Sequence, residues 1–301
     1  MKRGVVIANQ GATVEQVAEQ LAVVESLGYD SGWMPGIPNG PDVLTLLALA
    51  GRSTSRIELG PAIVATAPRH PVALACQALT VNDALHGRLT LGIGASHQRI
   101  VQGLWGLPYD RPARRMQEYL DILIPLLEHQ NVKFAGALMT TTYRLDASRT
   151  GATHPNVFIA ALGPKMLTVG ATHAAGVATW MVGLRTVETV TVPTVNTAAA
   201  AAGRSAPRIL VSLPYLLTTD RADGIERANQ EFALYTKLPA YQAMFEHEGV
   251  TMPGDIAIIG TEHDLAAAVR RQADTGVTDL QITPFGTATE QQRTIEYLSA
   301  L

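Results

Sequence analysis

The chain has 301 residues, of which 47% are hydrophobic, and a formal net charge of −3. This length suits one large α/β domain, and we expect residues 1–301 to form a single domain. No block of like charges interrupts the sequence, which argues against nucleic acid or an anionic membrane as the partner and favours a small molecule. No stretch approaches the roughly 20 apolar residues of a membrane span, and the first apolar run, Gly4 to Ala8, is too short for a secretion signal.

The first third of the chain predicts alternating strands and helices. Thr13 to Gln16 has the spacing of a capping box, apolar residues recur at helical spacing from Val14 to Val24, and Gly28 ends the helix. Strands at residues 4–8 and 31–34 flank this helix and make one βαβ unit. The pattern continues with a helix over residues 43–52, a strand over 57–64, a helix over 72–85 and a strand over 88–93.

Two insertions interrupt the rhythm in the rest of the chain. An amphipathic helix from Met116 to Leu127, kinked by Pro125, leads into an irregular insertion at about residues 129–154. A long polar helical stretch from about Ala222 to Glu248 is the second insertion. The other predicted strands cover residues 156–160, 176–181, 209–217 and 279–283, and an apolar run covers 256–260. The other predicted helices cover residues 164–173 and 261–276, and an Ala-rich helix ends at about residue 203.

About eight strands with parallel connections predict a (β/α)8 barrel with insertions, and an open doubly wound sheet is the alternative. In a barrel the chemistry would lie in the loops at the carboxyl ends of the strands. The single cysteine, Cys76, cannot form an internal disulfide and lies on the predicted buried side of a helix. We therefore expect a cytoplasmic protein with an inert thiol in its core.

Three loops carry residues that suit a ligand site, although each has a plainer interpretation. Gly92 to His97 offers two glycines and an imidazole, yet a turn with a solvated histidine would look the same. Leu59 to Pro71 contains three prolines and suits a rigid, irregular strand end, or an ordinary loop in which Pro71 begins a helix. Leu162 to Lys165 follows a strand and opens a helix, which suits a phosphate or a simple Gly-Pro turn.

The sequence gives little support for a metal site, a dinucleotide-binding motif or a nucleophile elbow. The eight histidines include no His-x-His or His-Glu-x-x-His spacing, so we expect no metal site. Gly92 to His97 lacks the third glycine of a dinucleotide fingerprint, and Gln98 takes the place of the glycine that a nucleophile elbow needs after Ser96. Trp33 and Trp180 end predicted strands and would line a pocket or simply pack.

Residues Ile57 to Glu128 resemble the luciferase-like monooxygenase superfamily. The resemblance rests on the combination of Arg56 to Pro61, Arg69 to Pro71, Leu85 to Gly94, Gly103-Leu104 and Arg111. Further matches are Gly28 to Ser31, Gly163 to Met166, Ala174 to Val177, Ile259 to Thr261 and Ala273 to Val277. Leu59 to Pro71 is most similar to the F420-dependent branch, exemplified by methylenetetrahydromethanopterin reductase.

The resemblance implies a site for a deazaflavin. It implies a non-proline cis peptide at Ala62-Ile63, which would support the ring from behind, a phosphate contact at Gly163 to Met166, and His97 as the acid/base residue. The implied cofactor-binding residues are Asn9, Trp33, Ala62, Ile63, Val64, Ala65, Gly94, Ser96, His97, Ala161, Leu162, Gly163, Pro164, Lys165 and Met166. Some relatives carry an Asp-His pair after the second strand where this chain has Trp33 to Ile37, so their proton relay cannot be carried over to this chain.

These implications predict an oxidoreductase that uses coenzyme F420. The deazaflavin would exchange a hydride at its C5 position with a C=C or C=N bond of a small organic substrate, in either direction, and His97 or a water molecule would handle the proton. An FMN-dependent monooxygenase on the same barrel is the first alternative, and a non-catalytic flavin-binding barrel is the second. A homodimer is expected because dimers are common in the family.

Overall fold

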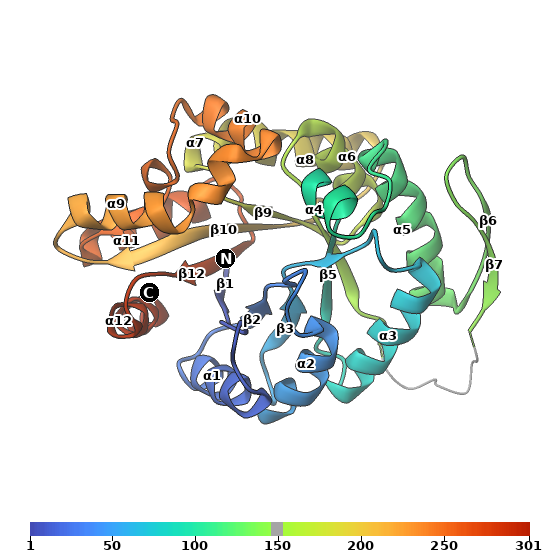
Figure 1. Cartoon of the computed structure of the whole chain (residues 1–301), viewed down its shortest axis with the longest axis horizontal. Helices are drawn as coiled ribbons and strands as arrows, with labels where there is room; N and C mark the ends of the chain where they lie inside the picture. The colour runs from blue at the N-terminus through green and yellow to red at the C-terminus, as the bar shows by residue number, and fades with distance from the viewer. Residues whose placement is uncertain (146–152) are drawn as a thin grey trace.

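The centre of the molecule is a parallel sheet that curls into a nearly closed barrel (Figure 1). The structure is a computed structural model that describes residues 1–145 and 153–301. In the order in which they pair, the strands are β3 (Glu58–Pro61), β2 (Ser31–Met34), β1 (Lys2–Val6), β12 (Asp279–Pro284), β10 (Arg208–Leu217), β9 (Gly176–Trp180), β8 (Asn156–Ala160), β5 (Thr90–Gly94) and β4 (Val64–Ala65). A parallel bridge between Leu59 and Leu89 joins β3 to the start of β5.

The predicted (β/α)8 barrel is confirmed. The third strand of the barrel is split, because β3 pairs with β2 whereas its continuation, β4, pairs with β5. The nine strands of the path therefore make eight strand positions. An additional short strand, β11 (Ile258–Gly260), pairs with the end of β10.

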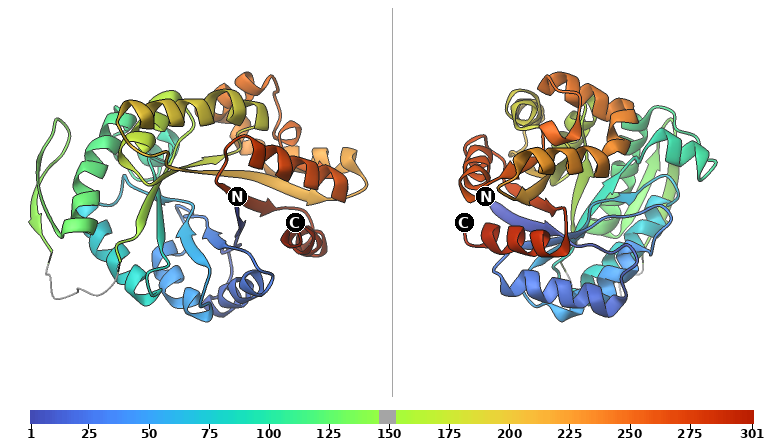
Figure 2. Two further views of the ribbon diagram at one scale, coloured as in Figure 1. Left: turned by 180° about the vertical axis from the view of Figure 1, so that it is seen from behind. Right: turned by 60° about the vertical axis from the view of Figure 1, so that its left-hand side comes forward.

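Helices surround the barrel and connect successive strands (Figure 2). They are α1 (Val14–Ser26), α2 (Val43–Ala50) with the 3-10 turn η1 (Gly51–Ser53), α3 (Pro71–Ala84), α4 (Gln98–Gly103), α5 (Pro112–His129), α6 (Pro164–His173), α7 (Leu184–Thr186) with the π-helical turn η3 (Val187–Thr191), α8 (Val192–Ala201), α9 (Arg221–Glu231), η4 (Ala233–Lys237), α10 (Pro239–Glu248), η5 (Pro253–Asp255), α11 (Glu262–Asp274) and α12 (Ala288–Ser299). None of these helices is long and apolar enough to cross a membrane.

Local sequence signals explain where several helices begin. Thr13 and Gln16 form the predicted capping box of α1, and Thr261 and Asp264 form that of α11. Pro71 occupies the first turn of α3, where its missing N–H costs no helical hydrogen bond.

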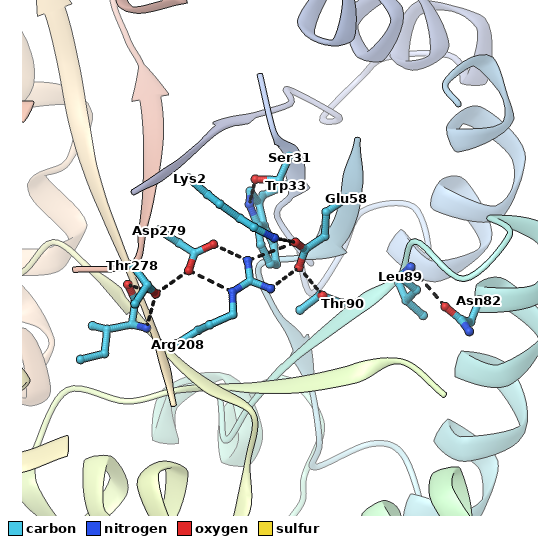
Figure 3. Close-up of polar contacts among 11 residues, drawn as sticks. Lys2, Ser31, Trp33, Glu58, Asn82, Leu89, Thr90, Arg208, Thr278 and Asp279 are labelled. Atoms are coloured by element: carbon cyan, nitrogen blue, oxygen red, sulfur yellow. Dashed lines mark hydrogen bonds and ion pairs between the residues drawn. The ribbon is translucent and has the colours of Figure 1, made fainter. Parts of the chain in front are cut away.

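The amino end of the barrel is closed by a cluster of polar and charged side chains from five strands (Figure 3). The Arg208 guanidinium donates hydrogen bonds to both carboxylate oxygens of Glu58, at 2.8 and 3.1 Å, and to both of Asp279. Glu58 also accepts from Thr90 and from Lys2. We call these residues the floor cluster.

Three predictions about individual segments were wrong. Residues 129–154 were expected to be irregular, but β6 (Asn131–Ala135) and β7 (Thr140–Arg144) form an antiparallel hairpin that projects beyond α5 (Figure 1); residues 146–152 lie outside the described part. The stretch from Ala222 to Glu248 is divided into α9, η4 and α10, because Pro239 starts a new helix. Cys76 is partly exposed on α3 rather than buried in the core.

Candidate active site

The split in the third strand creates a bulge at the carboxyl end of the barrel. The peptide bond between Ala62 and Ile63 is cis, so the predicted non-proline cis peptide is confirmed. The Ala62 N–H donates to the Met34 carbonyl at 2.7 Å, and from Val64 onward the chain pairs with β5. Ala62 and Ile63 are half-buried, so the bulge presents part of its surface.

Two glycines pack closely against this bulge. A Cβ atom on Gly36 would lie 2.1 Å from the Ile63 carbonyl oxygen, and one on Gly94 would lie 2.8 Å from Ile63 Cδ1 and 3.1 Å from Ala160 Cβ. Only glycine permits such an approach of the loop after β2 to the bulge. The bulge, the β2 loop and the end of β5 therefore meet at one place.

Asn9 connects the loop after β1 to the same place. Its Nδ2 donates to the Pro35 carbonyl at 2.9 Å, next to Gly36, and its side chain is 1% exposed. Its Oδ1 atom is buried and has no hydrogen-bond partner among the described residues. A buried amide oxygen without a donor is costly, which makes it a candidate acceptor for a ligand N–H or O–H.

His97 lies in the loop after β5, where it begins α4 without capping it through its side chain. The preceding residue, Ser96, has a left-handed backbone with φ of 60°, and its carbonyl accepts a hydrogen bond from the Tyr109 hydroxyl at 3.0 Å. These two features fix the turn that carries the imidazole. Burial lowers the pKa of His97, so the ring is neutral at neutral pH and can both donate and accept a hydrogen bond.

The predicted phosphate contact lies at the start of α6, directly after β8. Gly163 is the N-cap, Pro164 occupies the first turn and no side chain caps this end of the helix. Lys165 is exposed and Met166 is half-buried. Ala161 is buried and its N–H donates to the Ala178 carbonyl at 3.0 Å, which holds the start of this loop against β9. The loop thus presents a helix N-terminus and a lysine near the mouth of the barrel.

Trp33 is the one predicted cofactor contact that lies elsewhere. Its ring is 2% exposed, its Nε1 donates to Ser31 Oγ at 2.9 Å, and it stacks on Phe158 with ring centroids 6.1 Å apart. Figure 3 places it beside the floor cluster. Trp33 therefore fills the barrel interior, and its expected contact with the cofactor has no support in this position.

The interior above Trp33 is lined by small side chains. Ala62 and Ala178 pack on the layer that Trp33 forms with Phe158 and Leu210, and Ala160 lies beside Gly94. All three alanines are half-buried even though strands surround them. The barrel is thus tightly filled at its amino end and lightly filled towards its carboxyl end.

The mouth also holds a set of aromatic side chains that the sequence patterns did not bring together. Consecutive ring centroids lie between 4.7 and 5.9 Å apart in this set. We call it the aromatic row, and in order its members are His97, Tyr241, Tyr235, Trp180, Phe232 and Phe285. The sequence indicated only Trp180 and His97, because Tyr235 and Tyr241 belong to the stretch predicted as one polar helix; Pro239 between them was the available signal for a break.

The described residues hold no group of three or more His, Cys, Asp or Glu side chains that could bind a metal ion. Most of the predicted residues lie at the carboxyl ends of β1, β3, β5 and β8: Asn9, the bulge, Gly94 to His97 and Ala161 to Met166. These are the ends at which barrels of this type carry their active sites.

Comparisons with known proteins agree on the family and differ on the cofactor. The profile of the luciferase-like monooxygenase family matches residues 1–279. An uncharacterized protein of Mycobacterium tuberculosis is 28% identical over 317 residues, covering 92% of each chain. The 5,10-methylenetetrahydromethanopterin reductase of Methanopyrus kandleri is 26% identical over 251 residues, covering 78% of this chain and 71% of the reductase.

Solved structures share the fold. The coenzyme F420-dependent tetrahydromethanopterin reductase of Methanopyrus kandleri superposes with a TM-score of 0.83 at 20% identity, over 99% of this chain and 97% of the reductase. The oxygenating constituent of 3,6-diketocamphane monooxygenase from Pseudomonas putida, in complex with FMN, superposes with a TM-score of 0.77 at 17% identity, over 99% and 97% of the two chains.

Proposed function

Because the chain belongs to the luciferase-like monooxygenase family, we propose that it is an F420-dependent oxidoreductase that transfers a hydride between the deazaflavin and a small organic substrate. The observation that carries the proposal is the bulge at Ala62-Ile63, within the segment Leu59 to Pro71 that most resembles the F420-dependent branch. The proposal also includes a homodimer, expected from the resemblance, a cytoplasmic location, expected from the single cysteine, and a small-molecule substrate, expected from the charge pattern.

The residues at the mouth fit a flat tricyclic ring. The bulge offers a half-buried apolar surface, Gly36 and Gly94 let the neighbouring loop and strand pack directly against it, and Asn9 supplies an unpaired amide oxygen. Ala160 and Ala178 leave room on the barrel axis. In this arrangement Gly163 to Met166 would hold the cofactor phosphate through backbone N–H groups and the Lys165 ammonium.

The bound cofactor would supply a hydride donor or acceptor that reacts poorly with oxygen. The remaining work falls to the chain. The bulge and Asn9 would support the ring, and the buried floor of the barrel keeps that support rigid. His97 lies on the β5 loop, held by the Ser96 turn, where a neutral imidazole accepts a proton from the substrate or passes one from water.

Titration of the purified protein with F420 and, separately, with FMN tests this proposal. Cofactor fluorescence reports binding before any substrate is known. Micromolar or tighter binding of F420, with FMN at least tenfold weaker, is the expected result. The reverse preference, joined by oxygen consumption when a flavin reductase is added, would replace the proposal by an FMN-dependent monooxygenase. Binding of neither cofactor would contradict both the F420-dependent and the FMN-dependent function.

A further inference from the structure

We propose that the aromatic row is a substrate subsite that accepts uncharged molecules with a planar or alicyclic ring and disfavours anions. This inference rests on the proposed function for its chemistry, since it describes the substrate that would meet the cofactor. It rests on different residues for its evidence. None of the row except His97 belongs to the expected cofactor site.

The position of the row follows from the topology. His97, Trp180 and Phe285 follow or end β5, β9 and β12, so all three lie at the carboxyl end of the parallel barrel. Tyr235 and Tyr241 come from the insertion between β10 and β11, and β10 lies opposite the split third strand in the order of the eight positions. The row therefore begins beside the bulge at His97, because β5 pairs with β4, and continues to the opposite side of the mouth at Tyr235 and Tyr241. A ligand in the mouth would contact both the bulge and these rings.

The row has a buried part, whose rings pack in the protein, and a half-buried part, whose rings can contact a ligand. Phe285 is fully buried and Phe232 is 8% exposed, so these two rings anchor the insertion to the barrel. Trp180, Tyr235 and His97 are half-buried and retain free ring surface. Their rings meet edge to face, with an interplanar angle of 70° between Trp180 and Tyr235. A flat or alicyclic molecule gains contact with such a surface at little conformational cost.

Charge around the row argues against an anionic substrate. Burial raises the pKa of Tyr235 and lowers that of His97, so the rings are uncharged at neutral pH. A surface cavity of about 500 Å³ is lined by Arg227, Glu231 and Gly286, among others, and the last two are the sequence neighbours of Phe232 and Phe285 at one end of the row. Its arginine is already paired with Glu290, at 2.9 and 3.0 Å. A carboxylate or phosphate on the substrate would therefore find no uncommitted arginine in this lining.

Two matched probes test the inference, with calorimetry on the cofactor-loaded protein and again without cofactor at pH 7.5. 2-Naphthol is neutral at this pH and 2-naphthoate carries one negative charge on the same ring system. We expect 2-naphthol to bind at least tenfold more tightly. Trp180→Leu should weaken 2-naphthol binding by about tenfold, because it removes the largest ring with free surface, whereas Trp180→Phe should retain most of it.

Trp105→Leu is the matched control, since Trp105 is also a half-buried tryptophan but has no ring contact with the row; its 2-naphthol affinity should stay within about twofold. Circular dichroism and the F420 titration verify that each variant is folded. Equal or tighter binding of 2-naphthoate, or unchanged 2-naphthol binding in Trp180→Leu, overturns the inference. If F420 fails to bind while 2-naphthol binds as expected, the proposed function fails and the subsite stands; the opposite pattern removes the subsite alone.

Discussion

Removing Arg208 from the floor cluster should destabilise the barrel more than any surface ion pair would. Arg208→Met keeps the aliphatic length but leaves Glu58 and Asp279, whose side chains are 15% and 3% exposed, facing each other without the guanidinium between them. Breaking a buried ion pair on one side costs about 3–5 kcal/mol, since the remaining charge stays buried and unpaired. We expect a loss of this size in the free energy of unfolding at pH 7.5, measured by urea denaturation.

The destabilisation caused by Arg208→Met should depend on pH, and the direction follows from the pKa of Glu58. Burial by itself would raise the pKa of Glu58, but hydrogen bonds from Arg208 and Thr90 and the charge of Lys2 outweigh it and hold the pKa below its ordinary value. Such a group stabilises the fold above its unfolded pKa, and this contribution disappears as the pH falls through the folded pKa. In Arg208→Met the burial effect remains without its main counterweight, so the carboxyl group protonates more readily. The penalty should therefore shrink as the pH is lowered from 7.5 to 4.5.

Two further variants isolate the cause. Lys2 donates to Glu58 at 3.0 Å, but its side chain is 51% exposed, so Lys2→Met should cost at most about 1 kcal/mol. Arg208→Lys keeps the positive charge but cannot bridge two carboxylates with a planar guanidinium group. Its loss in free energy of unfolding should lie between those of Lys2→Met and Arg208→Met. A penalty below about 1 kcal/mol for Arg208→Met, or one that does not change with pH, would refute the view that the floor cluster stabilises the barrel electrostatically.

Three other changes probe the site and its surroundings. His97→Ala should lower turnover by about 10²–10⁴-fold, and full turnover in steady-state assays would remove His97 from proton transfer. Gly36→Ala should weaken F420 binding at least tenfold in fluorescence titrations, because its Cβ would lie 2.1 Å from a carbonyl oxygen of the bulge. Gly103→Ala is the control: its Cβ would have no atom within 4 Å, and F420 binding should not weaken. Glu118→Ala should speed proteolysis of hairpin β6–β7 and cost about 1–3 kcal/mol, because its buried carboxylate accepts three backbone hydrogen bonds from the hairpin turn; an unchanged cleavage rate would argue against this anchoring.

Elements with strong local signals were predictable from the sequence. The capping boxes at Thr13 and Thr261 involve residues three apart, so the sequence contains the whole interaction. The hairpin at residues 131–144 was missed because most of its side chains are exposed and only Val132 and Thr141 are buried. Alternation was present in Val132 and Phe134 but too short to outweigh the polar residues around it.

The floor cluster and the aromatic row could not be predicted for a different reason. Glu58 and Arg208 are 150 residues apart, and each stands at the edge of an apolar run, where a charged residue usually marks the exposed end of a strand. Only the closure of the barrel brings them together. The bulge, by contrast, was predicted from resemblance and not from the physical chemistry of Ala62-Ile63, since neither residue type is unusual in a strand.

The two ends of the barrel serve complementary purposes. A ligand needs space on the barrel axis near the carboxyl end, and the chain provides it with Gly94, Ala160 and Ala178, which contribute little packing of their own. Stabilisation from elsewhere must make up for this light packing if the strands are to keep their positions. Trp33 fills the next layer, and below it Arg208 joins the strands β3, β10 and β12 through directional hydrogen bonds. A change in the floor cluster should therefore reduce stability while leaving cofactor preference intact, whereas a side chain at Gly94 would press on Ile63 and disturb the bulge itself.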